Sequence, residues 1–290
     1  MSKLALGTVQ FGTDYGINSG VKVQPDEVSR IINYARNNGI NLLDTAQLYG
    51  SSEKVLGDSN TQDFNVVSKT RGFDKEYITE SIASFVISDL NQSLKLLKRN
   101  SLYALLVHHG EDLLRPGGEI IFNKLQILKD KGLVSKIGVS AYIDNQLIDI
   151  IDRFDIDIIQ LPMNIFDRRL IENGLLNKIY SKGIEIHTRS IFLQGLLLMD
   201  PKKRPKIFYR WSKLWKIWDE WLYDNKLSAL EATLRYMISL PEISRVLVGV
   251  DNKDQLHNII KALRGNIPTI PKELSTNDPD LLNPGNWSNL

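Results

Sequence analysis

The sequence contains no cysteine, and this absence limits the chemistry that the protein can perform. Disulfide bonds, iron–sulfur clusters, thiol nucleophiles and cysteine-ligated zinc are all excluded. Histidine is also scarce, at four of 290 residues.

Long hydrophobic runs and a strong charge imbalance are absent too. No apolar run is as long as the roughly 18 residues that a transmembrane helix needs. The apolar run within residues 1–12 is too short for a signal peptide. The 36 basic and 34 acidic residues are intermixed, give a net charge of +2 and form no basic stripe that would attract nucleic acid. We therefore expect a cytoplasmic protein that binds neither membranes nor nucleic acids.

What the sequence does contain is a regular alternation of two kinds of segment. Short apolar runs rich in β-branched residues predict strands that are buried on both faces. The longer amphipathic stretches between them predict helices; residues 26–39, for example, start on an acidic turn and end at a glycine. The predicted strands are residues 3–11, 40–46, 64–70, 102–109, 136–141, 156–164, 184–190 and 245–250.

Eight strands alternating with eight helices favour one (β/α)₈ barrel. We expect a single domain over residues 1–290, with an irregular tail from 265 to 290 that is rich in Pro, Asn and Asp. A doubly wound open sheet is the structural alternative. That fold usually has a G-x-G-x-x-G fingerprint after its first strand, and residues 7–16, GTVQFGTDYG, do not match it.

An aromatic segment, residues 208–225, interrupts the alternation after the seventh strand. Its tryptophans at 211, 215, 218 and 221 are spaced by four, three and three residues, which places them on one face of a helix. We favour an extra helix packed on the barrel; the alternative is a flap over a ligand.

Polar residues stand at the ends of most predicted strands, where barrels of this kind carry their active sites. Taken singly, each has a structural explanation; Asp251, for example, fits the N-cap of the last helix, with Asp254 at the third position. In chain order the residues are Asp44 with Tyr49 in the following loop, Lys69, His108 and His109, Ser140, Gln160 and Asn164, His187 and Arg189, and Gly249 and Asp251.

Taken together, four of these residues form a coherent acid system. A buried Asp44 would hold Lys69 charged, and Lys69 beside Tyr49 would lower the pKa of the phenol from about 10. A unit charge about 4 Å away is worth roughly 4 kcal/mol at an effective dielectric constant near 20. Tyr49 would then be a usable proton donor near neutral pH, and His108 could orient a carbonyl oxygen toward it.

The sequence resembles the aldo/keto reductase family over nearly its whole length. The element D-T-A-x-x-Y-G at residues 44–50 is the most specific part of the resemblance. The segments that carry it are LGTVQFG (6–12), LLDTAQLYG (42–50), SEKVLG (52–57), VVSKT (66–70), LLVHH (105–109), KIGVS (136–140), IIQLPMN (158–164), TRSIFLQGLL (188–197) and VLVGVDNKDQL (246–256).

The resemblance implies a (β/α)₈ barrel that reduces small-molecule aldehydes or ketones and uses no metal. The expected cofactor is NADPH, with NADH as the alternative. It implies a catalytic tetrad of Asp44, Tyr49, Lys69 and His108. His109, offset by one residue, would point to the other side of its strand. The sequence does not indicate an oligomeric state.

The resemblance also implies a set of cofactor-binding residues. Ser140 and Gln160 would hold the nicotinamide amide, although the family's usual Ser-Asn pair is Ser140-Ala141 here, so one contact is missing. The segment after the seventh strand would pass along the pyrophosphate, and the start of the last helix would meet the adenosine. The full set is Gly7, Thr8, Ser140, Gln160, Arg189, Ser190, Phe192, Leu193, Gln194, Gly195, Gly249, Val250, Asp251, Lys253, Gln255 and Asn258.

The choice between NADPH and NADH depends on the start of the last helix. A lysine of many relatives is replaced by Gly249, which would let backbone approach the ligand closely. If Asp251 caps the helix, Lys253 is left to pair with a 2′-phosphate, and this is the basis on which we expect NADPH. If Asp251 points at the ribose instead, it would favour NADH. Gln255 and Asn258, three residues apart, could reach the adenine or ribose.

Residues 187–199 and 280–287 resemble reductases encoded among surface-polysaccharide biosynthesis genes, which suggests a sugar-derived carbonyl as substrate. Arg189 could then meet a carboxylate or phosphate of the substrate, or form a structural ion pair. Two other functions remain as alternatives. One is a non-catalytic nicotinamide-binding barrel that acts as a redox sensor or regulatory subunit. The other is a metal-dependent hydrolase, against which the lack of an H-x-H motif argues.

Overall fold

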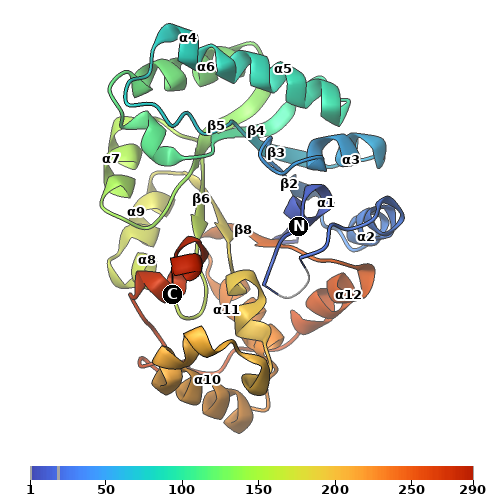
Figure 1. Ribbon diagram of the computed structural model, residues 1–290, viewed down its shortest axis with the longest axis vertical. Helices are drawn as coiled ribbons and strands as arrows, with labels where there is room; N and C mark the ends of the chain where they lie inside the picture. Colours follow the sequence, from blue (N-terminus) through green and yellow to red (C-terminus); the bar gives the residue numbers. More distant parts are fainter. Residues whose placement is uncertain (1, 18–19, 290) are drawn as a thin grey trace.

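Eight parallel strands close into a barrel in the order of the sequence, β1 to β8 (Figure 1). The computed structural model describes residues 2–17 and 20–289. The predicted (β/α)₈ barrel is therefore confirmed, and the open-sheet alternative is wrong. The strands are β1 (Leu4–Gly7), β2 (Leu42–Asp44), β3 (Asn65–Lys69), β4 (Leu102–Val107), β5 (Val134–Ser140), β6 (Ile158–Pro162), β7 (Glu185–Arg189) and β8 (Ile243–Val248).

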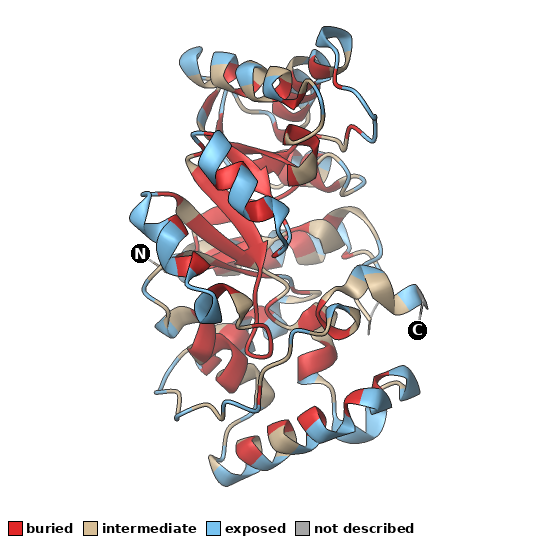
Figure 2. Cartoon of the chain, turned by 90° about the vertical axis from the view of Figure 1, so that its left-hand side faces the viewer, coloured by how far each residue is buried: buried red, intermediate tan, exposed pale blue. Residues whose placement is uncertain are grey.

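Helices surround the barrel, with buried inner faces and exposed outer faces (Figure 2). Short 3₁₀ helices, labelled η, fill some of the connections. The α-helices are α1 (Val9–Gly12), α2 (Pro25–Asn37), α3 (Ser52–Asp58), α4 (Glu80–Ala83), α5 (Phe85–Leu97), α6 (Gly118–Asp130), α7 (Gln146–Arg153), α8 (Arg169–Glu172), α9 (Leu175–Ser181), α10 (Ser212–Asp224), α11 (Ala229–Ser239), α12 (Lys253–Ala262) and α13 (Pro279–Leu282). The 3₁₀ helices are η1 (Gly110–Leu113), η2 (Leu193–Leu198), η3 (Pro201–Lys203), η4 (Lys206–Trp211) and η5 (Pro284–Asn289).

The strands are apolar on both faces because each lies between the barrel interior and a helix. A small interior cluster fills the barrel, and a much larger cluster lies between the strands and the helices. The interior cluster consists of Ala5, Leu42, Val67, Ala104, Leu106, Ile158 and Leu247. A packed interior leaves the mouth of the barrel as the place for a binding site.

The register of the strands brings the polar strand ends together. Asp44 lies opposite Gly7 of β1 and Val67 of β3, and Ser140 lies opposite Gln160. Because all strands are parallel, these ends meet at one mouth of the barrel. Helix α3 packs closely beside them against α5: a Cβ at Gly57 would lie 2.0 Å from the Leu96 carbonyl oxygen, so glycine is needed there.

Helix α10 lies outside the ring of helices, at the bottom of Figure 1. Its Trp215, Trp218 and Trp221 are buried, and the ring of Trp218 meets that of Phe166 edge-on at a centroid distance of 5.5 Å. None of the four tryptophans at 211, 215, 218 and 221 lines the large cavity formed by the described residues at the mouth of the barrel. The prediction of an extra helix packed on the barrel is therefore confirmed.

The tail after residue 265 is mostly irregular, as expected, apart from α13 and η5. It lies next to α10, since the indole nitrogen of Trp211 donates to Asp278 and that of Trp221 to the Thr269 carbonyl oxygen. Within the described residues, no helix is both long and apolar enough to cross a membrane.

Helix α10 should therefore contribute to stability and not to ligand binding. Trp218 is completely buried, so Trp218→Ala should lower the free energy of unfolding by about 3–5 kcal/mol. Urea unfolding measures this loss, and a titration with NADPH and NADH under native conditions should give unchanged affinities. A fall in nucleotide affinity without a loss of stability would show that the helix acts as a flap.

Candidate active site

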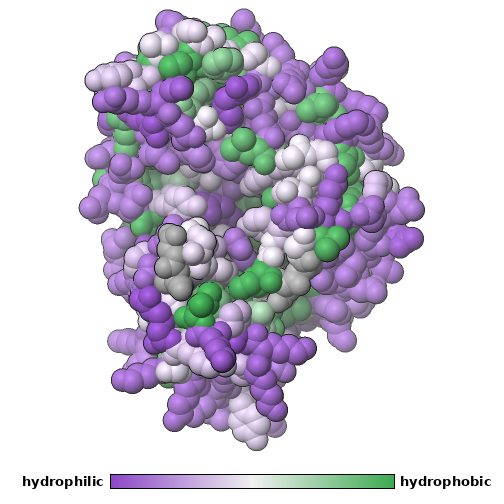
Figure 3. All heavy atoms as spheres, viewed as in Figure 1, coloured by the Kyte–Doolittle hydropathy of each residue, from purple (hydrophilic) through white to green (hydrophobic). Residues whose placement is uncertain are grey.

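A cavity of about 580 Å³ opens at the carboxyl ends of the strands. The face of the molecule seen in Figure 3 is hollowed near its middle. The strand-end and loop residues that the sequence singled out line most of the cavity. Those that line it are Gly7, Thr8, Asp44, Tyr49, His108, Ser140, Gln160, Arg189, Ser190, Phe192, Gln194, Gly195, Gly249, Asp251, Gln255 and Asn258.

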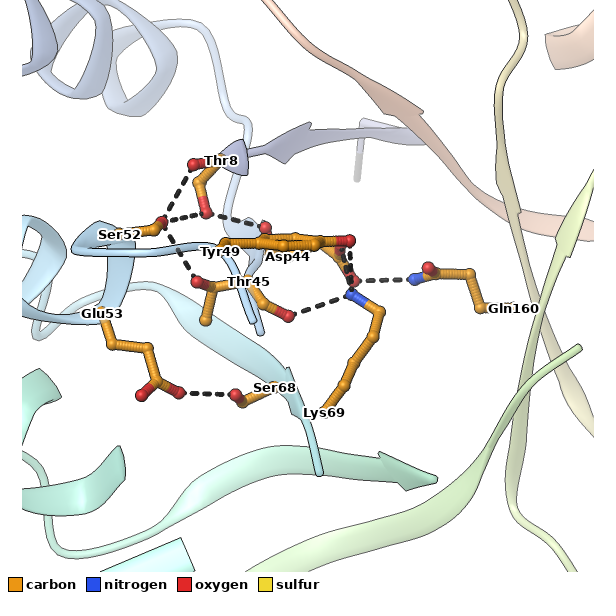
Figure 4. A network of polar contacts seen from close by, with 9 residues as sticks. All are labelled: Thr8, Asp44, Thr45, Tyr49, Ser52, Glu53, Ser68, Lys69 and Gln160. Atoms are coloured by element: carbon orange, nitrogen blue, oxygen red, sulfur yellow. Dashed lines mark hydrogen bonds and ion pairs between the residues drawn. The ribbon is translucent and has the colours of Figure 1, made fainter. Parts of the chain in front are cut away.

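Lys69 connects two of the other predicted catalytic residues, Asp44 and Tyr49 (Figure 4). Its Nζ is 2.7 Å from Asp44 Oδ2, 2.9 Å from the Thr45 carbonyl oxygen and 3.5 Å from Tyr49 Oη. The other carboxylate oxygen of Asp44 accepts from Gln160 Nε2 at 2.7 Å. Both charged groups are buried, with 1% of the Lys69 side chain and 4% of the Asp44 side chain exposed. Their remaining hydrogen-bonding capacity is largely satisfied, as a buried ion pair requires.

The ammonium group of Lys69 is held in its charged form. Burial opposes the charge, but Asp44 and Tyr49 outweigh it and raise the pKa of Lys69 above its ordinary value. A positive charge therefore persists beside the Tyr49 hydroxyl throughout the neutral pH range. The Nζ also lies 5.0 Å from the centroid of the Tyr49 ring.

His108, the fourth predicted catalytic residue, contacts the ring of Tyr49. The two rings meet edge-on, with centroids 5.9 Å apart. Burial, and after it the charge of Lys69, lowers the pKa of His108 to about 3. The imidazole is therefore neutral at neutral pH and can donate one N–H to a carbonyl oxygen near Tyr49.

His109 also lines the cavity, and its ring centroid is 5.4 Å from that of His108. The expectation that it points away is therefore wrong. Strand β4 ends at Val107, so the alternation of side chains along a strand no longer applies at residues 108 and 109.

A hydrogen-bonded layer under the site was not predicted from the sequence (Figure 4). Thr8 Oγ1 donates to the Asp44 carbonyl oxygen at 2.9 Å, and Ser52 Oγ donates to the Thr8 carbonyl oxygen at 2.9 Å. Thr45 Oγ1 donates to Ser52 Oγ at 3.1 Å. This layer fixes the loop from Asp44 to Tyr49 on the first strand. Ser52 belongs to the SEKVLG segment. That segment is part of the family resemblance, but no function was predicted for its residues from the sequence.

Ser140 and Gln160 lie side by side at the ends of β5 and β6. The Nε2 of Gln160 is committed to Asp44, which leaves its Oε1 buried and without a partner among the described residues. Such an oxygen can accept from the amide of a nicotinamide ring. Gln10 Oε1, His108 Nδ1 and Asp251 Oδ1 are buried and unpartnered in the same way, and their residues all line the cavity. This set of polar atoms fits a large polar ligand such as a nicotinamide dinucleotide. Gln10 was not predicted, and its place in LGTVQFG is the one sequence pattern that includes it.

The segment after β7 forms one wall of the cavity. Its backbone enters the left-handed region at Ser190, Leu193 and Gln194, with φ values of 58°, 45° and 52°. Non-glycine residues adopt this region at a cost of about 1–3 kcal/mol each, so the surrounding structure constrains the segment. Ser190, Phe192, Gln194 and Gly195 line the cavity, whereas Leu193 is fully buried in the core.

The far end of the cavity differs from the expectation. Asn252, and not Asp251, caps α12, because Asn252 Oδ1 accepts from the Gln255 N–H at 2.9 Å. Asp251 lines the cavity instead. Lys253 is exposed, its Nζ lies 3.6 Å from Asp254, and it does not line the cavity. The first premise of the NADPH expectation, that Asp251 caps the helix, is therefore wrong, and the pairing of Lys253 with a 2′-phosphate stays a prediction.

The other residues predicted to bind the adenosine end of the cofactor have different surroundings. The Gln255 side chain is already bonded to Asp251, to its backbone N–H at 2.8 Å and to its Oδ2 at 3.3 Å. Val250 is buried in the core. Gly249 and Asn258 line the cavity, and a Cβ at Gly249 would lie 2.5 Å from Gln10 Nε2.

Arg189 lines the catalytic end of the cavity and forms no ion pair with any residue that the structure describes. Its guanidinium carbon is 4.7 Å from the centroid of the Tyr142 ring, and one nitrogen donates weakly to the Ala141 carbonyl oxygen at 3.4 Å. The structural ion pair considered for it is therefore wrong.

Asn164 and His187 lie outside the site. Asn164 is buried and accepts from the backbone N–H groups of Phe166 and Asp167. His187 is buried and pairs with Glu185 at 2.7 Å. The described residues contain no group of three or more His, Asp or Glu side chains that could hold a metal ion, which removes support for a metal-dependent hydrolase.

A closed barrel with a lysine, an aspartate and a tyrosine joined at its mouth defines the class of protein as a barrel oxidoreductase. More particularly, the chain belongs to the aldo/keto reductase family, whose family model matches residues 3–273. It is an NAD(P)H-dependent enzyme.

The chain is similar to several known proteins at low identity. It is 23% identical to the uncharacterized oxidoreductase YqkF of Bacillus subtilis, over 90% of this chain and 87% of the relative. The holo form of the aldo-keto reductase AKR11C1 from Bacillus halodurans has a similar structure, with a TM-score of 0.74, 23% identity, and coverage of 92% of this chain and 88% of that one. A mutant of Gox0644 in complex with NADPH matches with a TM-score of 0.67 and 17% identity, over 96% of this chain and 90% of that one.

The lowered pKa of His108 predicts how stability depends on pH. In the unfolded chain the imidazole binds a proton near pH 6.5, whereas the native imidazole remains neutral down to about pH 3. Acidification through this window therefore favours the unfolded state. Between pH 7 and about 4.5, wild type should lose about 1–2 kcal/mol more stability than His108→Gln, after allowance for the partial exposure of the ring. Urea unfolding at both pH values measures the difference. An equal loss in the two proteins would show that His108 titrates normally.

Proposed function

We propose that this chain reduces an aldehyde or ketone to an alcohol, with Tyr49 as the proton donor. The observation that carries the proposal is the contact of Lys69 Nζ with both Asp44 and Tyr49 at the cavity. A bound reduced nicotinamide supplies the hydride in this chemistry. Ser140 and the free oxygen of Gln160 would hold its amide.

The residues of the chain would then handle the proton. Neutral His108 orients the carbonyl oxygen toward Tyr49 Oη, and Tyr49 gives its proton to that oxygen as the carbonyl carbon accepts the hydride. The charge of Lys69 stabilises the phenolate that remains, and Asp44 keeps Lys69 in place. The phenolate recovers its proton from water. The same steps in reverse would oxidise an alcohol.

The proton-donor role is tested by Tyr49→Phe. Loss of a general acid typically reduces a rate by a factor of about 10² to 10⁴, and kcat/KM for a panel of aldehydes should fall by this much. Binding of the nicotinamide nucleotide should change little. Tyr142→Phe removes another hydroxyl from the same cavity and serves as the matched control, which should keep most of its activity.

Two outcomes would contradict this assignment. Activity of Tyr49→Phe within a few-fold of wild type would remove Tyr49 from the reaction. Nucleotide binding by wild type without turnover of any carbonyl compound would favour the alternative function, a redox sensor or regulatory subunit.

We further propose that the substrate is a sugar-derived carbonyl compound with an acidic group. The catalytic end of the cavity is polar, with His109, Glu111, Tyr142 and Arg189 in its lining. Arg189 is the one cation that faces this cavity from the described residues, and it has no carboxylate partner. A carboxylate or phosphate of a substrate would supply that partner through charge-assisted hydrogen bonds.

Matched substrate pairs test this proposal, such as glucuronate against glucose and glyceraldehyde 3-phosphate against glyceraldehyde. The ratio of kcat/KM for the anionic member to that for the neutral member should fall about tenfold or more in Arg189→Gln, the effect of losing a charge-assisted hydrogen bond. Glu111→Gln, which removes the opposite charge from the same lining, should leave the ratio unchanged or raise it. A ratio that is insensitive to Arg189 would exclude the acidic group.

A further inference from the structure

Asp251 places a carboxylate at the end of the cavity that is formed by β8 and α12. Its Oδ2 accepts from Gln255 Nε2 at 3.3 Å, and its backbone N–H donates to Gln255 Oε1 at 2.8 Å. Its Oδ1 is buried and has no partner among the described residues. The side chain is therefore held in place with one acceptor oxygen available.

A second carboxylate reaches the same helix from elsewhere in the chain. Glu27 lies in α2, which packs beside α12 (Figure 1). Its Oε1 accepts the backbone N–H of Lys253, the first residue of α12, at 2.7 Å. The Gln255 N–H is taken by Asn252. Two of the N–H groups that a phosphate would use at this helix start are thus already bonded within the protein.

Among the described residues, no lysine or arginine offsets the carboxylate of Asp251 at this end of the cavity. Lys253 is directed to Asp254 outside the cavity, and Arg30 pairs with Glu27 at 2.7 Å while remaining largely exposed. Arg189 lies at the other end, close enough to His108 to help lower its pKa.

The orientation of a dinucleotide follows from the position of Tyr49. The nicotinamide ring must lie at the catalytic end, so the adenosine must extend to the end formed by β8 and α12. NADPH differs from NADH by a phosphate on the adenosine ribose 2′-oxygen, which adds about 1.5 to 2 negative charges. A carboxylate repels that phosphate, but it accepts a hydrogen bond from the 2′-hydroxyl of NADH.

We propose that Asp251, with Glu27 behind it, makes this chain prefer NADH to NADPH. The inference rests on the proposed function only in that the nicotinamide lies at Tyr49. Asp251 accepts from the ribose 2′-hydroxyl, and Glu27 occupies the Lys253 N–H at the start of α12.

Calorimetric titration with each nucleotide tests the proposal without an assay of activity. At low salt, wild type should bind NADH at least about tenfold more tightly than NADPH, which corresponds to about 1.4 kcal/mol. Asp251→Asn keeps the shape of the side chain and an acceptor for Gln255 but removes the charge, so it should reduce the preference about five- to tenfold. Glu27→Gln keeps the acceptor for the Lys253 N–H and should reduce the preference by a smaller factor.

Asp254→Asn is the matched control. It removes a carboxylate from the same turn of α12 and with it the partner of Lys253, but Asp254 does not line the cavity, so the preference should change much less than in Asp251→Asn. Because the effect is electrostatic, added salt should weaken the discrimination in wild type and have less effect in Asp251→Asn. Thermal unfolding of each variant verifies that it is folded.

The possible failures can be distinguished. Tighter binding of NADPH by wild type would overturn this inference alone, and loss of that preference in Lys253→Ala would assign the phosphate to Lys253. An NADH preference that is unchanged in Asp251→Asn would overturn the role of Asp251. Failure of both nucleotides to bind would overturn the proposed function and this inference with it.

Discussion

The buried ion pair between Lys69 and Asp44 is the interaction on which the whole site depends. Two charges taken out of water cost several kcal/mol each, and only close geometry and additional hydrogen bonds offset that cost. The additional bonds come from the Thr45 carbonyl oxygen and from Gln160 Nε2. Since Asp44, Lys69 and Gln160 belong to β2, β3 and β6, the pair requires the closed barrel. Loss of one partner would leave an unpaired buried charge, at a cost of about 3–5 kcal/mol.

The chemistry proposed for Tyr49 uses that same pair. The loop that carries Tyr49 starts at Asp44, and the carbonyl oxygen of Thr45 in this loop accepts a hydrogen bond from Lys69. Ser52, just after the loop, donates to the carbonyl oxygen of Thr8, which directly follows β1. The charge of Lys69 and the neutrality of His108 also have a common origin. Lys69 is buried with a carboxylate partner that keeps it charged, whereas partial burial and the charge of Lys69 keep the imidazole unprotonated. A donor, a stabilising cation and a neutral orienting group thus follow from one arrangement of side chains.

The sequence predicts the catalytic end of this arrangement well and the far end poorly, for physical reasons. Strands buried on both faces give clear apolar runs, and the residues that end them must meet at one mouth of a barrel. The N-cap of α12 is different, because Asp251 and Asn252 are both good capping residues and sequence patterns do not place a cap to within one position. The contact of Glu27 with Lys253 joins residues 226 positions apart, and no local pattern contains it. The predicted direction of the His109 side chain is wrong because side chains alternate between the two faces only within a strand, and β4 ends at Val107.

The two ends of the cavity are built under different constraints. At the catalytic end, Lys69 and Asp44 are almost fully buried, so a substitution there affects folding and chemistry together. At the far end, Asp251 is half-buried and Gln255 is exposed, and neither supports the barrel core. Changes of charge there cost little stability, since surface ion pairs contribute about 0–1 kcal/mol. The nucleotide preference can therefore change without disturbing the barrel or the ion pair, because recognition of the adenosine ribose depends on side chains that the fold does not need.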